Sequence, residues 1–152
     1  MAIGKTPSKT DLHERPDNNP ALYQGRVYFM QHRNLESSKE HFLVVLNKNP
    51  SADERIYVAV ITSQIDNQEK WITALKLPEE TLVKLSPGDY AELTKPSVIS
   101  CNSFPSLPKP EFEAKVRCSK ECNDLPNAIL EKIIAGVKKS PLIIPKIKDL
   151  II

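Results

Sequence analysis

Histidine is the side chain best suited to proton transfer at neutral pH, and this 152-residue sequence has three. His41 stands immediately before an apolar run, and a histidine can both accept and donate a proton because its unperturbed pKa is ~6.5. The hydroxyls of Thr62 and Ser63 follow the next apolar run and can donate hydrogen bonds to a phosphate oxygen. His32 and Arg33 lie in a polar stretch before His41 and offer a second source of positive charge. These five residues are the candidates for general acid–base chemistry on a phosphate ester.

The cysteines and glycines give little support for a zinc site, a redox site or a glycine-rich phosphate-binding loop. Cys118 and Cys122 have a tolerable spacing for half of a zinc site, but there is no second pair and Cys101 is remote in sequence. Three cysteines in a chain of this length indicate reduced thiols rather than a disulfide framework, so a redox or zinc protein is the least supported interpretation. Only four glycines are present, which leaves little for a glycine-rich phosphate cradle. We expect no cofactor and no metal.

Composition and charge narrow the class of protein. The 21 Lys and Arg residues nearly balance the 19 Asp and Glu residues, and a net charge of +2 excludes a strongly basic nucleic-acid tail. The 40% hydrophobic content is enough for a core, whereas the longest apolar runs are far shorter than the ~20 residues that cross a bilayer. No secretory signal is visible at the start, so the expected compartment is the cytoplasm.

The candidate residues must be positioned by β-strands. Residues 1–24 are rich in proline and poor in large apolar side chains, which predicts a flexible arm. Runs of aromatic and branched residues predict strands, first a meander of three and then further short ones. The expected strands cover residues 26–30, 41–46, 55–61, 71–77, 81–85 and 97–101. A helix that begins at Pro78 is the alternative for the region between the fourth and the fifth strand, and a loop rich in proline follows the last strand.

One helix is predicted near the C-terminus, over residues 124–140. Apolar residues recur there at helical spacing and form a single stripe, which should pack on the sheet. Asp124 is placed to cap this helix, with Pro126 in its first turn, and Ser140 followed by a proline ends it. Residues 142–152 should add or cover an edge strand. Residues 25–141 are therefore expected to form one domain, a small, curled antiparallel barrel with a C-terminal helix.

The order of these segments resembles the PemK/MazF-like family of toxins, whose members are small SH3-like barrels. The resemblance extends over residues 25–140 and depends on four short motifs in order. They are Gly25-Arg26-Val27-Tyr28-Phe29, His41-Phe42-Leu43-Val44-Val45-Leu46-Asn47, Ile61-Thr62-Ser63 and Lys95-Pro96-Ser97-Val98-Ile99.

The resemblance implies a metal-independent endoribonuclease that cuts single-stranded RNA, forms a homodimer and is inhibited by an antitoxin protein. It places catalysis at His41, Thr62 and Ser63, and RNA contacts at His32, Arg33 and Asn102. Two departures from the family pattern are evident. His41 stands where many members have a catalytic arginine, and Asn102 stands where a run that begins with aspartate is usual.

These departures leave a second interpretation open. A barrel that has lost the arginine and the carboxylate would bind a protein or RNA partner without cutting it, and the proline-rich arm could dock on such a partner as an extended segment. Turnover of RNA by the purified protein distinguishes the two interpretations.

Overall fold

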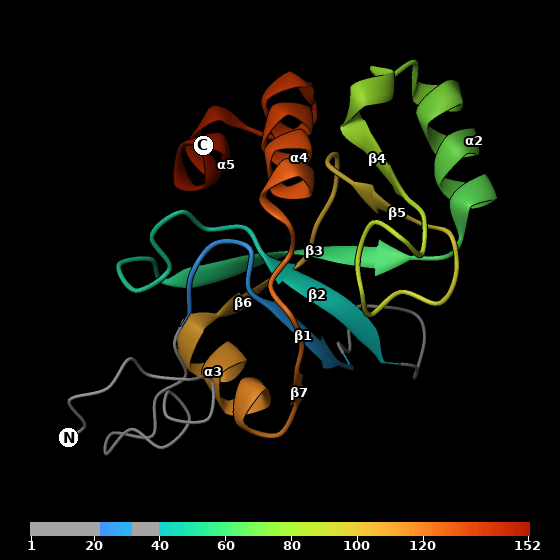
Figure 1. Cartoon of the computed structure of the whole chain (residues 1–152). Coiled ribbons are helices and arrows are strands. Elements are labelled where there is room, and N and C mark those ends of the chain that lie inside the picture. Colours follow the sequence, from blue (N-terminus) through green and yellow to red (C-terminus); the bar gives the residue numbers. More distant parts are fainter. Residues whose placement is uncertain (1–21, 32–39) are drawn as a thin grey trace, which may run out of the picture.

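The computed structural model describes residues 22–31 and 40–152, and shows an antiparallel sheet with helices packed on both of its faces (Figure 1). The strands are β1 (Val27–Met30), β2 (His41–Val45), β3 (Arg55–Thr62), β4 (Leu82–Leu85), β5 (Ser97–Ser100), β6 (Ser106–Pro108) and β7 (Lys120–Glu121). The helices are α2 (Ile65–Leu75), the 3-10 turn η1 (Glu79–Thr81), α3 (Lys109–Arg117), α4 (Asn127–Lys139) and α5 (Pro145–Ile151). Within the described ranges, none of the helices is long and apolar enough to cross a membrane.

The strand order is β4-β5-β3-β2-β1-β7, and β6 pairs with the first part of β3. All pairs are antiparallel, and the eight-residue β3 contacts three other strands along its length. Among the described strands, β4 and β7 end the hydrogen-bonded path and do not pair with each other, so the curled sheet stays open. The predicted fold class, a mainly β, curled antiparallel barrel with a C-terminal helix, is confirmed as a barrel-like fold whose sheet does not close.

The sheet is buried on both faces, which explains the nearly continuous apolar runs of β2 and β3. One face carries Val44 and Ile61 and packs against Ile133 of α4. The opposite face carries Leu43 and packs against Phe112 of α3. Burial of each such side chain contributes about 1.5–3 kcal/mol relative to exposure, so helix packing on both faces dominates the stability of the sheet.

The predicted C-terminal helix is α4, but it starts later and differently than expected. Its N-cap is Pro126, and no side chain caps the helix. Asp124 instead accepts hydrogen bonds from the Tyr23 hydroxyl, the shorter of them 2.8 Å long. The prediction that Asp124 caps the helix was therefore wrong, because a proline with extended backbone occupies the cap position.

Residues 71–77, predicted as a strand, are mostly helical in the structure, because α2 covers residues up to Leu75. This helix is mostly exposed and buries only Ile72, and the half-buried Gln68 and Glu69 on the same face are polar, which hides the helical spacing in the sequence. The helix ends at Lys76, whose φ of 54° is left-handed, and the backbone N–H of Lys76 accordingly closes the last turn. The strand expected over 81–85 is confirmed as β4, and the turn after Pro78 is η1.

Two further helices replace predicted irregular or strand structure. The proline-rich region after residue 104 was expected to be a loop. It forms β6 and then α3, with Pro110 in the first turn of the helix. The C-terminal residues form α5, which begins at Pro145, and not an edge strand. Proline is compatible with the first helical turn because its missing N–H has no partner there in any case.

Asn47, after β2, and Gln24, before β1, form side-chain hydrogen bonds to the backbone of neighbouring segments. Asn47 is fully buried, and its amide donates to the Arg55 carbonyl and accepts from the Tyr57 N–H, which clamps the loop between β2 and β3. Gln24 donates from its side-chain nitrogen to the carbonyls of Leu46 and Ile151, each at 2.7 Å. Gln24 thus belongs to the folded body, although the sequence predicted it as the last residue of the arm.

Candidate functional site

The ends of β2 and β3 bring two of the predicted catalytic residues together. β2 begins at His41, and β3 ends at Thr62. The register pairs Phe42 with Ile61, so one further step places His41 opposite Thr62 on the neighbouring strand. Directly opposite residues of an antiparallel pair share a face, with Cβ atoms roughly 4.5–5.5 Å apart. His41 and Thr62 therefore lie on the same face, and both are half-buried.

The turn after β3 fixes the hydroxyl of Thr62. The N–H of Gln64 donates to Thr62 Oγ1 at 3.2 Å, and the N–H of Ile65 donates to the Ser63 carbonyl at 2.9 Å. Because Thr62 Oγ1 accepts a backbone bond here, its hydroxyl hydrogen can still donate to a bound group. Ser63 is exposed at the same turn, immediately before α2. Hydroxyl donors and an imidazole thus meet at one end of the sheet.

A hollow of about 380 Å³ opens between the end of β1 and α3, and neither His41 nor Thr62 is among the residues that line it. It is lined by Met30, which pairs with His41, by Glu40, and by Lys115 from α3. The sequence analysis did not single out Glu40 or Lys115, since only the packing of α3 against the sheet brings the lysine here. Lys115 thus brings a positive charge to the hollow that Met30, the cross-strand neighbour of His41, also lines.

Asn102 lies elsewhere and has a structural role. Its side chain is buried, donates to Thr81 Oγ1 at 2.7 Å and accepts from Ser140 Oγ at 2.6 Å. These bonds connect the segment after β5 to η1 and to the end of α4. An RNA contact by Asn102 would have to replace them, and nothing in its position supports that prediction. His32 and Arg33 lie outside the described residues.

The three cysteines are free thiols, as expected. Burial raises the pKa of Cys101 to about 12, which keeps it protonated and makes it a poor nucleophile or metal ligand. Its thiol points at the Ile133 carbonyl of α4, 3.5 Å away. Within the described part of the chain, no group of three or more His, Cys, Asp or Glu side chains is arranged to hold a metal ion.

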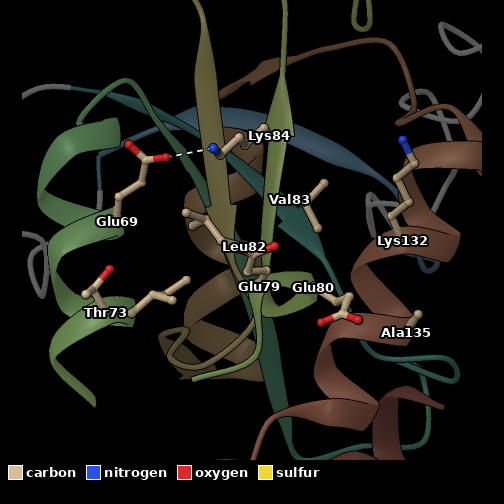
Figure 2. Close-up of a pocket in the computed structure, with 10 residues that line it drawn as sticks. Glu69, Thr73, Glu79, Glu80, Leu82, Val83, Lys84, Lys132 and Ala135 are labelled. Atoms are coloured by element: carbon tan, nitrogen blue, oxygen red, sulfur yellow. Dashed lines mark ion pairs between the residues drawn. The ribbon is translucent and has the colours of Figure 1, made fainter. Parts of the chain in front are cut away.

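A larger groove, of about 610 Å³, lies between α2 and α4 with β4 at its base (Figure 2). Figure 2 shows Glu69 and Thr73 of α2 on one side of β4, and Lys132 and Ala135 of α4 on the other. No motif in the sequence indicates this groove. The second half of its wall α2 falls in the strand expected over residues 71–77, so two helices on either side of β4 were not expected.

The charges of the groove are partly paired. Lys84 on β4 forms an ion pair with Glu69 of α2 at 2.7 Å, which raises the pKa of Lys84. Glu80 pairs with Lys139 of α4 at 2.8 Å, and the hydrogen bond from Lys139 lowers the pKa of Glu80. Lys132 has no ion-pair partner among the described residues. Glu79 of η1, which also lines the groove, has no ion-pair partner in the part of the chain that the structure describes either, so one unpaired charge of each sign remains.

Comparisons with known proteins give a weak likeness. No known family model matches the chain, and no curated protein matches it. Among solved structures, it is similar to a chain of an endoribonuclease in complex with its cognate antitoxin from a mycobacterial species, with a TM-score of 0.49 and 12% identity over 77% of this chain and 89% of that one. Membership in the toxin family therefore stays a prediction from the motifs.

Proposed function

We propose that this protein is a toxin-like endoribonuclease that cleaves single-stranded RNA without a metal ion, with His41, Thr62 and Ser63 at the site of cleavage. The observation that supports this proposal most is the register of β2 and β3, which sets an imidazole opposite a hydroxyl at an open end of the sheet. The proposal includes inhibition by an antitoxin and a homodimer, which come from the resemblance in the motifs, and action in the cytoplasm, which was expected because no secretory signal is visible.

The proposed reaction uses the 2′-hydroxyl of the RNA as the nucleophile. His41 accepts its proton, the 2′ oxygen bonds to phosphorus, and the bond from phosphorus to the 5′ oxygen breaks. The leaving oxygen takes a proton from water, because the site is open to solvent, and the products are a 2′,3′-cyclic phosphate and a 5′-hydroxyl. Thr62 and Ser63 donate hydrogen bonds to the phosphate oxygens, whose charge grows in the transition state, and Lys115 adds positive charge.

The test measures cleavage of end-labelled single-stranded RNA of varied sequence by the purified chain in the presence of a chelator. We expect His41→Ala to lower the rate by about 10²–10⁴-fold, which is the usual contribution of a positioned general base. His13→Ala is the matched control, since it removes an imidazole from the segment before the barrel and should leave the rate unchanged. The proposal is wrong if the wild-type chain cuts no RNA, or if His41→Ala cuts as fast as wild type.

A second function, a noncatalytic barrel that binds a protein or RNA partner, is favoured by the buried position of Asn102 and by the groove along β4. The same experiment distinguishes the two functions. Binding of RNA or of a protein by wild type, without any cleavage and without an effect of His41→Ala, would support the binding module.

A further inference from the structure

The groove between α2 and α4 exposes the outer edge of a β-strand. β4 ends the path of the sheet and pairs only with β5 among the described strands. In Figure 2, Leu82 and Lys84 point toward α2, whereas Val83 points toward α4. The two helices therefore cover opposite faces of the sheet here, and the open side of the groove meets the edge of β4.

The hydrogen bonds at the start of β4 show which backbone groups face the groove. The N–H of Cys101 donates to the Thr81 carbonyl at 2.7 Å, next to the pairing of β4 with β5. Bonding alternates along an antiparallel strand, so Val83 and Leu85 direct their backbone groups to β5 as Thr81 does. Leu82 and Lys84 accordingly direct theirs outward. Within the described residues, no hydrogen bond engages the outward groups of Lys84 or the carbonyl of Leu82.

The outward edge is closed at both ends. The N–H of Leu82 donates to the Glu79 carbonyl, which ends η1. The N–H of Ser86, next in the outward series, donates to the carboxylate of Asp89 at 2.7 Å. Three backbone groups remain between these points, namely the Leu82 carbonyl and the N–H and carbonyl of Lys84. This is the set that one short added strand would use.

We propose that β4 binds an extended segment of a partner protein, which adds to the sheet as a further strand between α2 and α4. Successive side chains of such a segment would alternate between the two helices. On one side they meet Ile72 and Leu82, and on the other they meet Val83 and Ala135, so apolar side chains fit both sides. Lys132 has no ion-pair partner in the described ranges and favours an acidic side chain beside α4, whereas Glu79, equally unpaired at the η1 end of the groove, disfavours one there.

The geometry favours an extended segment over a second copy of this chain. In a pair of copies joined at β4, each strand would lie between its own α2 and α4. Strand pairing at the ~4.8 Å spacing of a sheet would then also require the helices of the two copies to pack against one another. A single chain in extended conformation has no such flanking helices and can enter the groove. This inference does not depend on the proposed RNA cleavage.

The test selects binders from a displayed library of random peptides of about ten residues, long enough for one strand with flanks. Selected peptides are synthesised, and their affinities for the full chain are measured by fluorescence anisotropy. Lys84→Pro removes the outward N–H at an edge position where proline is tolerated, and Lys84→Thr removes the ammonium and its pairing with Glu69 but keeps the N–H. We expect about a tenfold or greater loss of affinity for Lys84→Pro and less than about a threefold change for Lys84→Thr.

Amide hydrogen exchange of wild type provides a measurement that needs no variant. A bound peptide should slow exchange at the Lys84 amide, which is otherwise unprotected, and Lys132→Gln should weaken peptides that carry an acid by a few-fold. The proposal is overturned if no peptide is selected, or if bound peptides leave the Lys84 amide unprotected. It is also overturned if Lys84→Pro and Lys84→Thr weaken binding equally, because the ammonium and not the strand edge is then recognised. Slow hydrogen exchange at the Lys84 amide in the absence of any peptide would show that a second copy of the chain or residues 1–21 occupy the edge of β4. That result would also reject the proposal.

Discussion

Gly136 of α4 lies where the helix makes its closest approach to the rest of the fold. A Cβ added at this position would lie 2.6 Å from Cys101 Sγ, 2.7 Å from the Glu80 carbonyl oxygen and 3.1 Å from Cys101 Cβ. Cys101 is buried and the Glu80 oxygen belongs to the backbone of η1, so neither atom can move aside without displacing its element. We therefore expect Gly136→Ala to push α4 away from η1.

Two opposing effects set the magnitude. In an unconstrained helix interior, alanine is more favourable than glycine by about 1 kcal/mol. Overpacking of a tight interior costs about 1–3 kcal/mol, and contact with backbone as well as with a buried thiol places this site near the upper end. The difference is a net loss of about 1–2 kcal/mol in the free energy of unfolding. Packing therefore reverses the sign that helix propensity alone would give.

Urea denaturation followed by circular dichroism measures this change. The matched control is Gly88→Ala, since a Cβ at Gly88 meets nothing within 4 Å and its φ is not left-handed. There the same chemical change should be neutral or stabilise the fold by up to about 1 kcal/mol, through the reduced entropy of the unfolded chain. A Gly136→Ala variant as stable as wild type, or more stable, would refute the packing of α4 against η1 described above.

Two further perturbations test the interior. Asn102→Ala should lower the free energy of unfolding by about 2–3 kcal/mol, because it leaves the hydroxyls of Thr81 and Ser140 without their buried partner. Ser103→Ala, on the adjacent exposed residue, is the control and should change the free energy of unfolding little. Urea denaturation of both variants measures the two changes, and equal stabilities of the variants would contradict the prediction. Burial raises the pKa of the Cys101 thiol from 9.0 to about 12, so the unfolded state releases this proton at lower pH than the folded state, and stability should fall as pH rises from 9 toward 12. Between about pH 8 and about pH 10, wild type should lose about 1 kcal/mol in the free energy of unfolding, and Cys101→Ala should lose less. If the stability of both proteins falls in parallel with pH, the loss does not come from the Cys101 thiol.

Strands could be predicted from the sequence more reliably than helices, and prolines are the main reason. The runs that became β2 and β3 are apolar enough to indicate buried strands by themselves. Pro108 and Pro126, by contrast, are the N-caps of α3 and α4, and Pro145 opens α5. Proline in an otherwise irregular stretch indicates a loop, although its fixed φ and missing N–H suit a helix start equally well. Only the packing of Phe112 and its neighbours against the sheet distinguishes the two outcomes for α3.

The candidate site was predictable only where it depends on strand pairing. His41 and Thr62 lie at the ends of consecutive strands, so a simple meander already sets them side by side. Asn102 was assigned from its place after a strand, but its contacts depend on the end of α4, which is remote in sequence. The groove along β4 was not predicted, because the inward face of α2 is hard to recognise: Ile65, Gln68, Glu69 and Ile72 recur at helical spacing, but two of these four residues are polar.

A sheet covered by helices on both faces has little to prevent its strands from sliding past one another. In a sheet with one solvent-exposed face, a shift of one strand by one residue relative to its neighbour would expose every apolar side chain of that strand. The side chains of β2 and β3 would remain buried after such a shift, because both faces of the sheet are covered. The buried amide of Asn47 can satisfy its bonds to Arg55 and Tyr57 in one alignment only. This single polar group therefore selects among alignments that the hydrophobic effect leaves nearly equal, and through β3 it determines which hydroxyl stands opposite His41.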